Sequence, residues 1–166
     1  FASLKEIKEI LSTPLNDLIF KAQTVHKKSF PKLDIQLASL LSIKTGSCPE
    51  DCKYCPQSAH YNVGLKKEKL INIELVEKAA RKAKENGADR FCMGAAWKKL
   101  NNGKDLELVI KMIKTVKSLD LEACVTLGSI TKEQALTLKK AGLDAYNHNI
   151  DTSPEFYKEI ISTRSF

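Results

Sequence analysis

The sequence contains no apolar run long enough to cross a bilayer, so we expect no membrane-spanning segment and no membrane partner. No charged-then-apolar signal pattern stands at its start, and because residue 1 is Phe, we expect the true N-terminus to be missing or processed. Nothing like Gly-x-Gly-x-x-Gly follows the first expected strand, which argues against a dinucleotide-binding fold.

Acidic residues are outnumbered by basic ones, 20 against 27, which gives a net charge of +7. A basic chain suggests a polyanion as partner. The lysines are spread along expected helices, as at Lys66-Lys67, Lys98-Lys99 and Lys139-Lys140, without interleaved aromatic residues. Because no nucleic-acid motif accompanies the charge, we expect no nucleic-acid binding.

Five cysteines are present, an odd number, and three of them share one loop. This distribution argues against a disulfide framework and favours a reducing compartment, so we expect a cytoplasmic protein. A chain of 166 residues with 43% hydrophobic residues is long enough to bury one core.

The three clustered cysteines, Cys48, Cys52 and Cys55, have the spacing Cys-x3-Cys-x2-Cys in a loop rich in turn residues. Thiolates are soft ligands that select zinc, copper(I) or iron–sulfur clusters. Structural zinc usually takes four ligands, and this loop offers three cysteines. Three thiolates on a cubane cluster would leave one iron open to another ligand, whereas a structural metal site in a binding module is the alternative.

Apolar runs bounded by turn residues alternate with amphipathic segments along most of the chain. The expected strands are 37–43, 90–94, 121–127 and 145–151. The expected helices are 4–11, 14–28, 73–86, 105–119 with Asp105 as its cap, 131–141 opened by Thr131 and Gln134, and one beginning near Ser153-Pro154-Glu155.

This order predicts an α/β protein with parallel strands, either a doubly wound sheet or a (β/α) TIM-type barrel. A barrel of eight units takes about 250 residues, so four βα units are about the first half of one. We therefore expect an N-terminal helical cap over residues 1–30 and a half-barrel over 35–166 that is truncated after Arg164. The fragment alone would leave strand edges uncovered.

Side chains two residues apart share a face of a strand, which groups Asn147, Asn149 and Asp151 on the fourth expected strand. Polar rows of this kind are typical of ligand sites at the C-terminal ends of barrel strands. The alternative is that they end the strand by turn chemistry, which fits Asp151. Cys92 and Cys124 lie inside the second and third expected strands, where buried lone cysteines are usually inert.

Four motifs in order resemble the radical S-adenosylmethionine (SAM) enzymes, and within them the biotin synthases. They are Leu40–Gly46, Cys48–Gln57, Arg90–Trp97 and Tyr146–Thr152. The resemblance runs from about Leu15 to the last residue.

The resemblance implies that Cys48, Cys52 and Cys55 hold a [4Fe-4S] cluster whose open iron binds SAM. It places Tyr54, Ala95, Asn149 and Asp151 at the SAM site, and Asn147 and Asn149 near the dethiobiotin substrate. The alternative for Tyr54 is that its ring only covers the cluster from water.

For Cys92 and Cys124 the resemblance implies a [2Fe-2S] cluster, completed by a third Cys and an Arg that belong to later strands. Arg90 shares a strand face with Cys92, and since a buried charge needs a counter-charge, we expect Arg90 to offset the charge of this cluster. The alternative is that Arg90 reaches solvent at the entry of its strand.

The implied activity is insertion of sulfur into dethiobiotin to form biotin, by a radical SAM sulfurtransferase. The expected partners are dethiobiotin, an electron-donor protein such as a flavodoxin or ferredoxin, and a second copy of the full-length chain. The fragment alone is expected to be inactive. Another radical SAM enzyme with the same cysteine spacing stays open as an alternative.

Overall fold

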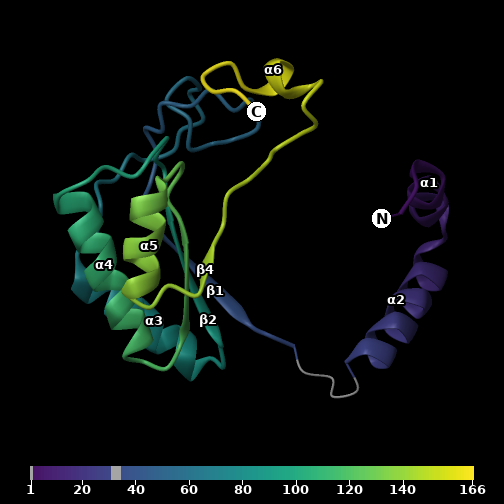
Figure 1. Ribbon diagram of the computed structural model, residues 1–166, viewed down its shortest axis with the longest axis horizontal. Helices are drawn as coiled ribbons and strands as arrows, with labels where there is room; N and C mark the ends of the chain where they lie inside the picture. The colour runs from purple at the N-terminus through teal and green to yellow at the C-terminus, as the bar shows by residue number, and fades with distance from the viewer. Residues whose placement is uncertain (1, 31–34) are drawn as a thin grey trace. The chain divides into compact units, whose positions relative to one another are not determined.

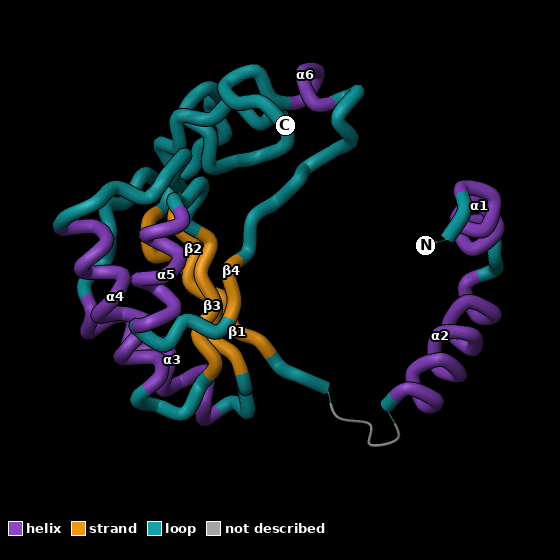
Figure 2. The backbone as a smooth tube through the Cα atoms, in the orientation of Figure 1, coloured by secondary structure: helices purple, strands orange, loops and turns teal. Residues whose placement is uncertain are grey.

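The computed structural model describes residues 2–30 and 35–166, which form two compact units, Phe1–Ile35 and Gln36–Phe166. No helix in these ranges is long and apolar enough to cross a bilayer. Figure 1 shows the course of the chain, and Figure 2 shows its helices and strands.

The first unit consists of the two expected helices, α1 (Leu4–Ser12) and α2 (Leu15–Ser29). Ser3 and Glu6 form a reciprocal capping box at the start of α1. Pro14 precedes the first turn of α2, where its missing N–H costs no hydrogen bond. Neither helix contains a buried residue, and the role of this unit as a cap on the barrel stays a prediction.

The second unit is built on four parallel strands in the spatial order β1-β2-β3-β4. The strands are β1 (Ala38–Lys44), β2 (Arg90–Ala95), β3 (Glu122–Thr126) and β4 (Ala145–Tyr146). The helices are α3 (Ile73–Glu85), α4 (Lys104–Lys117), α5 (Lys132–Lys140) and the short α6 (Tyr157–Ile160).

Strand order distinguishes the two α/β architectures that the sequence left open. In a doubly wound sheet the order reverses at a switch point, and helices cover both faces. Here the order follows the sequence, and α3, α4 and α5 lie on one side of the sheet (Figures 1 and 2). The prediction of a partial (β/α) TIM-type barrel is therefore confirmed, with the four described strands forming an open sheet.

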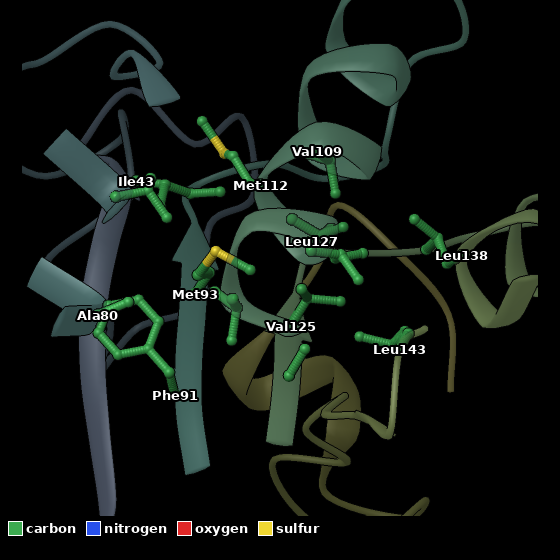
Figure 3. Packing of buried hydrophobic residues seen from close by; sticks show 14 of the residues in the cluster. Ile43, Ala80, Phe91, Met93, Val109, Met112, Val125, Leu127, Leu138 and Leu143 are labelled. Atoms are coloured by element: carbon green, nitrogen blue, oxygen red, sulfur yellow. The ribbon is translucent and has the colours of Figure 1, made fainter. Parts of the chain in front are cut away.

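The core lies between the sheet and these helices. Alternate side chains of β2 and β3 enter it, including Phe91, Met93 and Val125, each at most 1% exposed. They pack against buried residues of α4 such as Val109 and Met112 (Figure 3). Because side chains alternate along a strand, the intervening residues of β2 and β3 face away from the helices.

Capping residues in the sequence predicted most helix starts correctly. Thr131 and Gln134 form the expected capping box of α5, and the Asn72 side chain accepts from the Leu75 N–H at the start of α3. The prediction that Asp105 caps α4 was wrong, because the helix begins at Lys104 after Gly103, whose φ is 76°. Asp105 instead lies in the first turn, where a negative charge still favours the helix dipole.

The prediction of a fourth strand over 145–151 was wrong beyond Tyr146, where β4 ends. The last ladder contact is the Asn147 N–H donating to the Val125 carbonyl at 2.9 Å, and β3 ends at Thr126. Gly128, with a φ of 75°, then turns the neighbouring chain away, so residues 148–151 lack a strand to pair with on that side. Residues 147–151 are irregular, and the argument that Asn147, Asn149 and Asp151 share a strand face does not hold.

Substitution of Gly128 tests how tightly the loops at the C-terminal end of the sheet are packed. A Cβ atom there would collide with the Trp97 and Lys98 carbonyl oxygens, and an L residue would also be strained at this φ. We expect Gly128→Ala to cost about 2–4 kcal/mol of unfolding free energy, since the left-handed penalty and overpacking add.

Gly87→Ala is the matched control, because Gly87 has a φ of 83° but a Cβ there meets nothing within 4 Å. It should cost only about 1–2 kcal/mol. Urea unfolding followed by the fluorescence of Trp97 measures both, and equal losses would contradict the packing account.

Candidate cluster and cofactor site

The loop after β1 and the segment after β4 lie side by side at the C-terminal end of the strands (Figure 1). They enclose a cavity of about 270 Å³ together with the ends of β1 and β2. Cys48, Cys52 and Cys55 all line this cavity. Ligand sites of α/β barrels lie at this end of the sheet, as the sequence predicts here.

Turn residues and backbone hydrogen bonds fold the cysteine loop back on itself. The Cys48 N–H donates to the Gln57 carbonyl at 2.9 Å, and the Cys55 N–H donates to the Cys52 carbonyl at 3.0 Å. Gly46 and Ser47 have φ values of 72° and 55°, which reverse the chain just before the first cysteine. The loop thus directs its three thiols into one space.

The segment 157–163 forms a second wall of this loop. The Asp51 carboxylate accepts hydrogen bonds from the Ser162 N–H at 2.9 Å and the Thr163 N–H at 3.1 Å. The Lys53 N–H donates to the Ile160 carbonyl at 3.1 Å. The hydrogen bond from the Ser162 hydroxyl is the largest influence on the pKa of Asp51. Together with weaker hydrogen bonds from the Ser162 backbone and from Thr163, it holds this pKa well below its usual range, against the opposing effect of desolvation.

A small apolar cluster covers Cys52 from the side of this segment. Cys52, Tyr157 and Ile161 are buried together, with Cys55 and Ile160 packed against them. Burial raises the pKa of the Cys52 thiol from 9.0 to about 11, although the positive charge of Arg164 opposes the shift. The fold therefore favours the neutral thiol of Cys52 over its thiolate.

Cys48 also lies near a cation, the ammonium group of Lys44. Burial raises the pKa of its thiol, while a hydrogen bond from the Glu50 backbone and the charge of Lys44 lower it. The Lys44 Nζ donates to the Gly46 carbonyl at 2.5 Å and to the Ala96 carbonyl at 2.9 Å. Burial lowers the pKa of Lys44, and the charge of Cys48 partly restores it.

Glu50 contributes a buried carboxylate to the wall of the cavity. Its Oε2 accepts from the Thr163 hydroxyl. Its Oε1 has no hydrogen-bond donor among the described residues, and the Lys98 Nζ lies 3.6 Å from it. Glu50 therefore places a buried carboxylate, ion-paired with Lys98, in the wall of the cavity.

Tyr54 and Asp151, both predicted as cofactor-binding residues, meet at this cavity. The Tyr54 hydroxyl donates to Asp151 Oδ1, and the Arg164 guanidinium pairs with Asp151 Oδ2. The Asp151 side chain is 1% exposed, and its φ is 75°. Arg164 and Asp51 were missed by the sequence reasoning, since no local pattern distinguishes them.

The remaining predicted ligand-binding residues, Ala95, Asn147 and Asn149, do not all lie at the cavity. Ala95 and Asn149 line the cavity, whereas Asn147 does not, although its Nδ2 donates to Asn149 Oδ1 at 3.3 Å. His148 also lines the cavity and was not predicted. Its Nδ1 lies 3.2 Å from the Gly128 carbonyl oxygen.

Cys92 and Cys124 are direct neighbours in the parallel register of β2 and β3. They lie on the sheet face opposite Phe91 and Met93, as strand alternation predicts. Burial, followed by the hydrogen bond and charge of Cys92, raises the pKa of the Cys124 thiol from 9.0 to about 11. The structure thus brings together the two cysteines that the sequence placed on separate strands.

Arg90 is paired one layer below these cysteines. Its Nε and Nη2 lie 2.9 Å and 2.6 Å from Glu122 Oε2, which also accepts from Gln36 Nε2 at 2.8 Å. The hydrogen bond to Glu122 raises the pKa of Arg90, and any charge on Cys124 and Cys92 acts in the same direction. Arg90 therefore has Glu122 as its counter-charge, and its effect on a bound cluster stays a prediction.

The three loop cysteines fit an iron–sulfur cluster by donor chemistry and by their shared cavity. Their soft thiolates each suit a different iron atom. Among residues 2–30 and 35–166, no three His, Cys, Asp or Glu side chains are grouped as ligands of a single metal ion. His60, five positions after Cys55, is a candidate fourth ligand of a metal at this loop. Its Nε2 instead lies 3.1 Å from the Pro49 carbonyl oxygen, within hydrogen-bond distance.

The chain matches the profile of the radical SAM superfamily over residues 42–166. It is 57% identical to the biotin synthase of Idiomarina loihiensis over 99% of this chain and 47% of that protein. It is 56% identical to the biotin synthase of Hahella chejuensis and 57% identical to that of Pseudomonas aeruginosa, over 99% of this chain and 46% of each. The chain spans about half the length of the curated relatives it matches.

The raised thiol pKa values predict a pH-dependent reactivity in the metal-free protein. Because the thiolate is the nucleophile, Cys52 and Cys124 should alkylate slowly at pH 8 and reach half their maximal rate near pH 11. A pulse of iodoacetamide followed by peptide mass spectrometry measures each rate.

The same cysteines in the urea-unfolded chain are the control and should reach half-rate near pH 9, the ordinary value from which the fold raises their pKa. The fold favours the neutral thiols, so their contribution to stability is complete below about pH 9 and is lost as the pH rises toward 11. A rate plateau by pH 9 in the folded protein would be the contrary result.

Asp51→Asn should loosen the segment 157–163, because an amide has one oxygen where the carboxylate offers two charged acceptors to Ser162 and Thr163. Hydrogen exchange at the amides of Ser162 and Thr163 should speed up. Asp120→Asn is the control, since the Asp120 side chain is 92% exposed and pairs with Lys84 at the surface. Unchanged exchange in Asp51→Asn would show that this carboxylate does not hold the segment.

Proposed function

Because the chain belongs to the radical SAM superfamily, we propose that it is the N-terminal part of a biotin synthase, which inserts sulfur into dethiobiotin to form biotin. The convergence of Cys48, Cys52 and Cys55 on one cavity carries this proposal. Its support also includes the high identity to biotin synthases over nearly the whole chain. The cysteine pair on the open sheet face favours this activity over other radical SAM chemistries.

Cys48, Cys52 and Cys55 would hold the [4Fe-4S] cluster, and the remaining iron would be open to the amine and carboxylate of SAM. When bound, the cluster and SAM together supply the electron and the reactive carbon centre that remove hydrogen from unactivated C–H bonds. The protein contributes position, charge and exclusion of water. Tyr157 and Ile161 exclude water from the Cys52 side of the site.

Residues around the cavity would bind SAM by ordinary polar contacts. Asp151 and Asn149 offer acceptors to hydroxyl and amine donors, while Tyr54 presents an aromatic ring at the rim. Ala95 is small, so the ligand can approach the β2 backbone closely. Asn147, which contacts Asn149, would act on the substrate side.

Cys92 and Cys124 would provide two ligands of a [2Fe-2S] cluster on the same sheet face. Binding requires thiolates, and the raised pKa of Cys124 means that assembly would release a proton there. A third Cys and an Arg would come from strands beyond this chain.

The further partners of the proposed enzyme are an electron-donor protein such as a flavodoxin or ferredoxin and a second copy of the full-length chain. Five free cysteines are compatible with a reducing compartment, and we place the enzyme in the cytoplasm. The fragment alone would be inactive, because the remaining ligands of the second cluster lie outside it.

Anaerobic reconstitution of the full-length protein with iron and sulfide, followed by reduction with dithionite and addition of SAM and dethiobiotin, tests this function. We expect broad visible absorption, cleavage of SAM to 5′-deoxyadenosine and methionine, and formation of biotin. SAM cleavage without biotin would indicate another radical SAM enzyme. Tight zinc binding without sulfide would instead indicate a structural metal module.

Cys52→Ala in the full-length enzyme should abolish both cluster binding at the loop and SAM cleavage, because two thiolates cannot replace three. Iron and sulfide content and 5′-deoxyadenosine yield are the measurements. Retained SAM cleavage would refute the assignment of Cys52 as a ligand.

Cys124→Ala should spare reductive SAM cleavage but stop biotin formation, since it alters only the proposed second cluster. Assaying 5′-deoxyadenosine and biotin in the same reaction separates the two steps. If both products still form, the assignment of Cys124 to a second cluster is wrong.

A further inference from the structure

Arg164 lies in the wall of the cysteine cavity, although it is far from the cysteine loop in sequence. Its side chain is only 19% exposed. The Nε donates to the Tyr157 hydroxyl at 2.8 Å, and Nη2 pairs with Asp151 Oδ2. The guanidinium is thus held between a buried tyrosine and a buried carboxylate, next to Cys52.

Asp151 is the residue that this guanidinium fixes. It adopts a left-handed conformation, with φ at 75°, and its carboxylate is almost completely buried at the cavity wall. Asp is one of the few non-glycine residues that adopt this conformation readily, so the backbone turns here without a glycine. Within the described part of the chain, its side chain is held by the Tyr54 hydroxyl and by Arg164.

Of these two groups, Arg164 contributes more to fixing the position of the Asp151 carboxylate. Tyr54 is 57% exposed, whereas Arg164 is largely buried and carries the opposite charge to Asp151. A buried carboxylate that loses its only ion-pair partner is strongly disfavoured. The other cation of the cavity wall that lies beside a cysteine, Lys44, donates to the Gly46 and Ala96 carbonyls.

We propose that Arg164 is a positioning residue for ligand binding in this cavity: it holds the Asp151 carboxylate beside Cys52, where its free lone pairs accept hydroxyl or ammonium donors of the ligand. The inference rests on the proposed function, which makes SAM the ligand. Each carboxylate oxygen can accept more than one hydrogen bond, so Asp151 can bind Arg164 and a ligand together.

A double-mutant cycle in the full-length, anaerobically reconstituted enzyme tests this role. Arg164→Met, Asp151→Asn and the double variant are compared by the Kd of SAM on the oxidised cluster, without turnover. Arg164→Met should weaken SAM binding about tenfold or more, since it leaves the Asp151 carboxylate unpaired. In the Asp151→Asn background, Arg164→Met should raise the Kd of SAM by less than about threefold, because the effects of residues that act as a unit are not additive.

Iron and sulfide content serves as the second measurement. It should stay at the unmodified level in Arg164→Met, since Arg164 is not a cluster ligand. Arg164→Lys keeps a charged donor and should restore part of the affinity. Arg81→Met is the matched control, because Arg81 is a surface residue paired with Glu77 within α3, and its SAM Kd should not change.

Equal effects of Arg164→Met in both backgrounds, or an unchanged Kd, would overturn the proposal. Loss of iron and sulfide in both Arg164 variants would also overturn it, since Arg164 would then be a structural residue. If the unmodified enzyme assembles a cluster but does not bind SAM, the proposed function itself fails, which is a different result from either of these.

Discussion

The hydrogen bonds between the Asp51 carboxylate and the backbone of Ser162 and Thr163 hold the two halves of the site together. One half is the cysteine loop that follows β1, and the other is the chain that follows β4. Without this connection, the loop would be joined to the segment 157–163 mainly by the Lys53–Ile160 and Glu50–Thr163 hydrogen bonds, and the apolar cover of Cys52 by Tyr157 and Ile161 would be held less firmly. A loop residue between two of the cysteines thus determines how a distant segment encloses them.

The sheet supplies the second constraint, which is the alternation of side chains along parallel strands. The residues of β2 and β3 that enter the helix-covered core fix the register of these strands. That register in turn places Cys92 beside Cys124 on the opposite face, with the Arg90–Glu122 ion pair one layer below. Packing of the core on one face of the sheet therefore fixes the positions of Cys92 and Cys124 on the other face. The same strands carry the cysteine loop at their C-terminal end.

Periodicity and turn chemistry predicted most of the fold, because helix caps, strand alternation and parallel crossovers are local or nearly local. The capping box of Thr131 and Gln134 and the shared face of Cys92 and Cys124 are examples. The fourth strand was predicted too long, because strand length depends on a partner that the local sequence does not describe. The roles of Asp51 and Arg164 were not predictable, since Asp51 is paired with residues 111 and 112 positions away and Arg164 with a carboxylate in an irregular segment.

The central claim is that three thiolates of one loop leave one iron of a cluster open to SAM. Electron–nuclear double resonance on the full-length protein, reconstituted with iron and sulfide, reduced and mixed with SAM labelled with ¹⁵N and ¹⁷O in its methionine part, tests it most directly. The account predicts hyperfine coupling of both labels to the reduced [4Fe-4S] cluster. A cluster that shows no coupling to either label would contradict it.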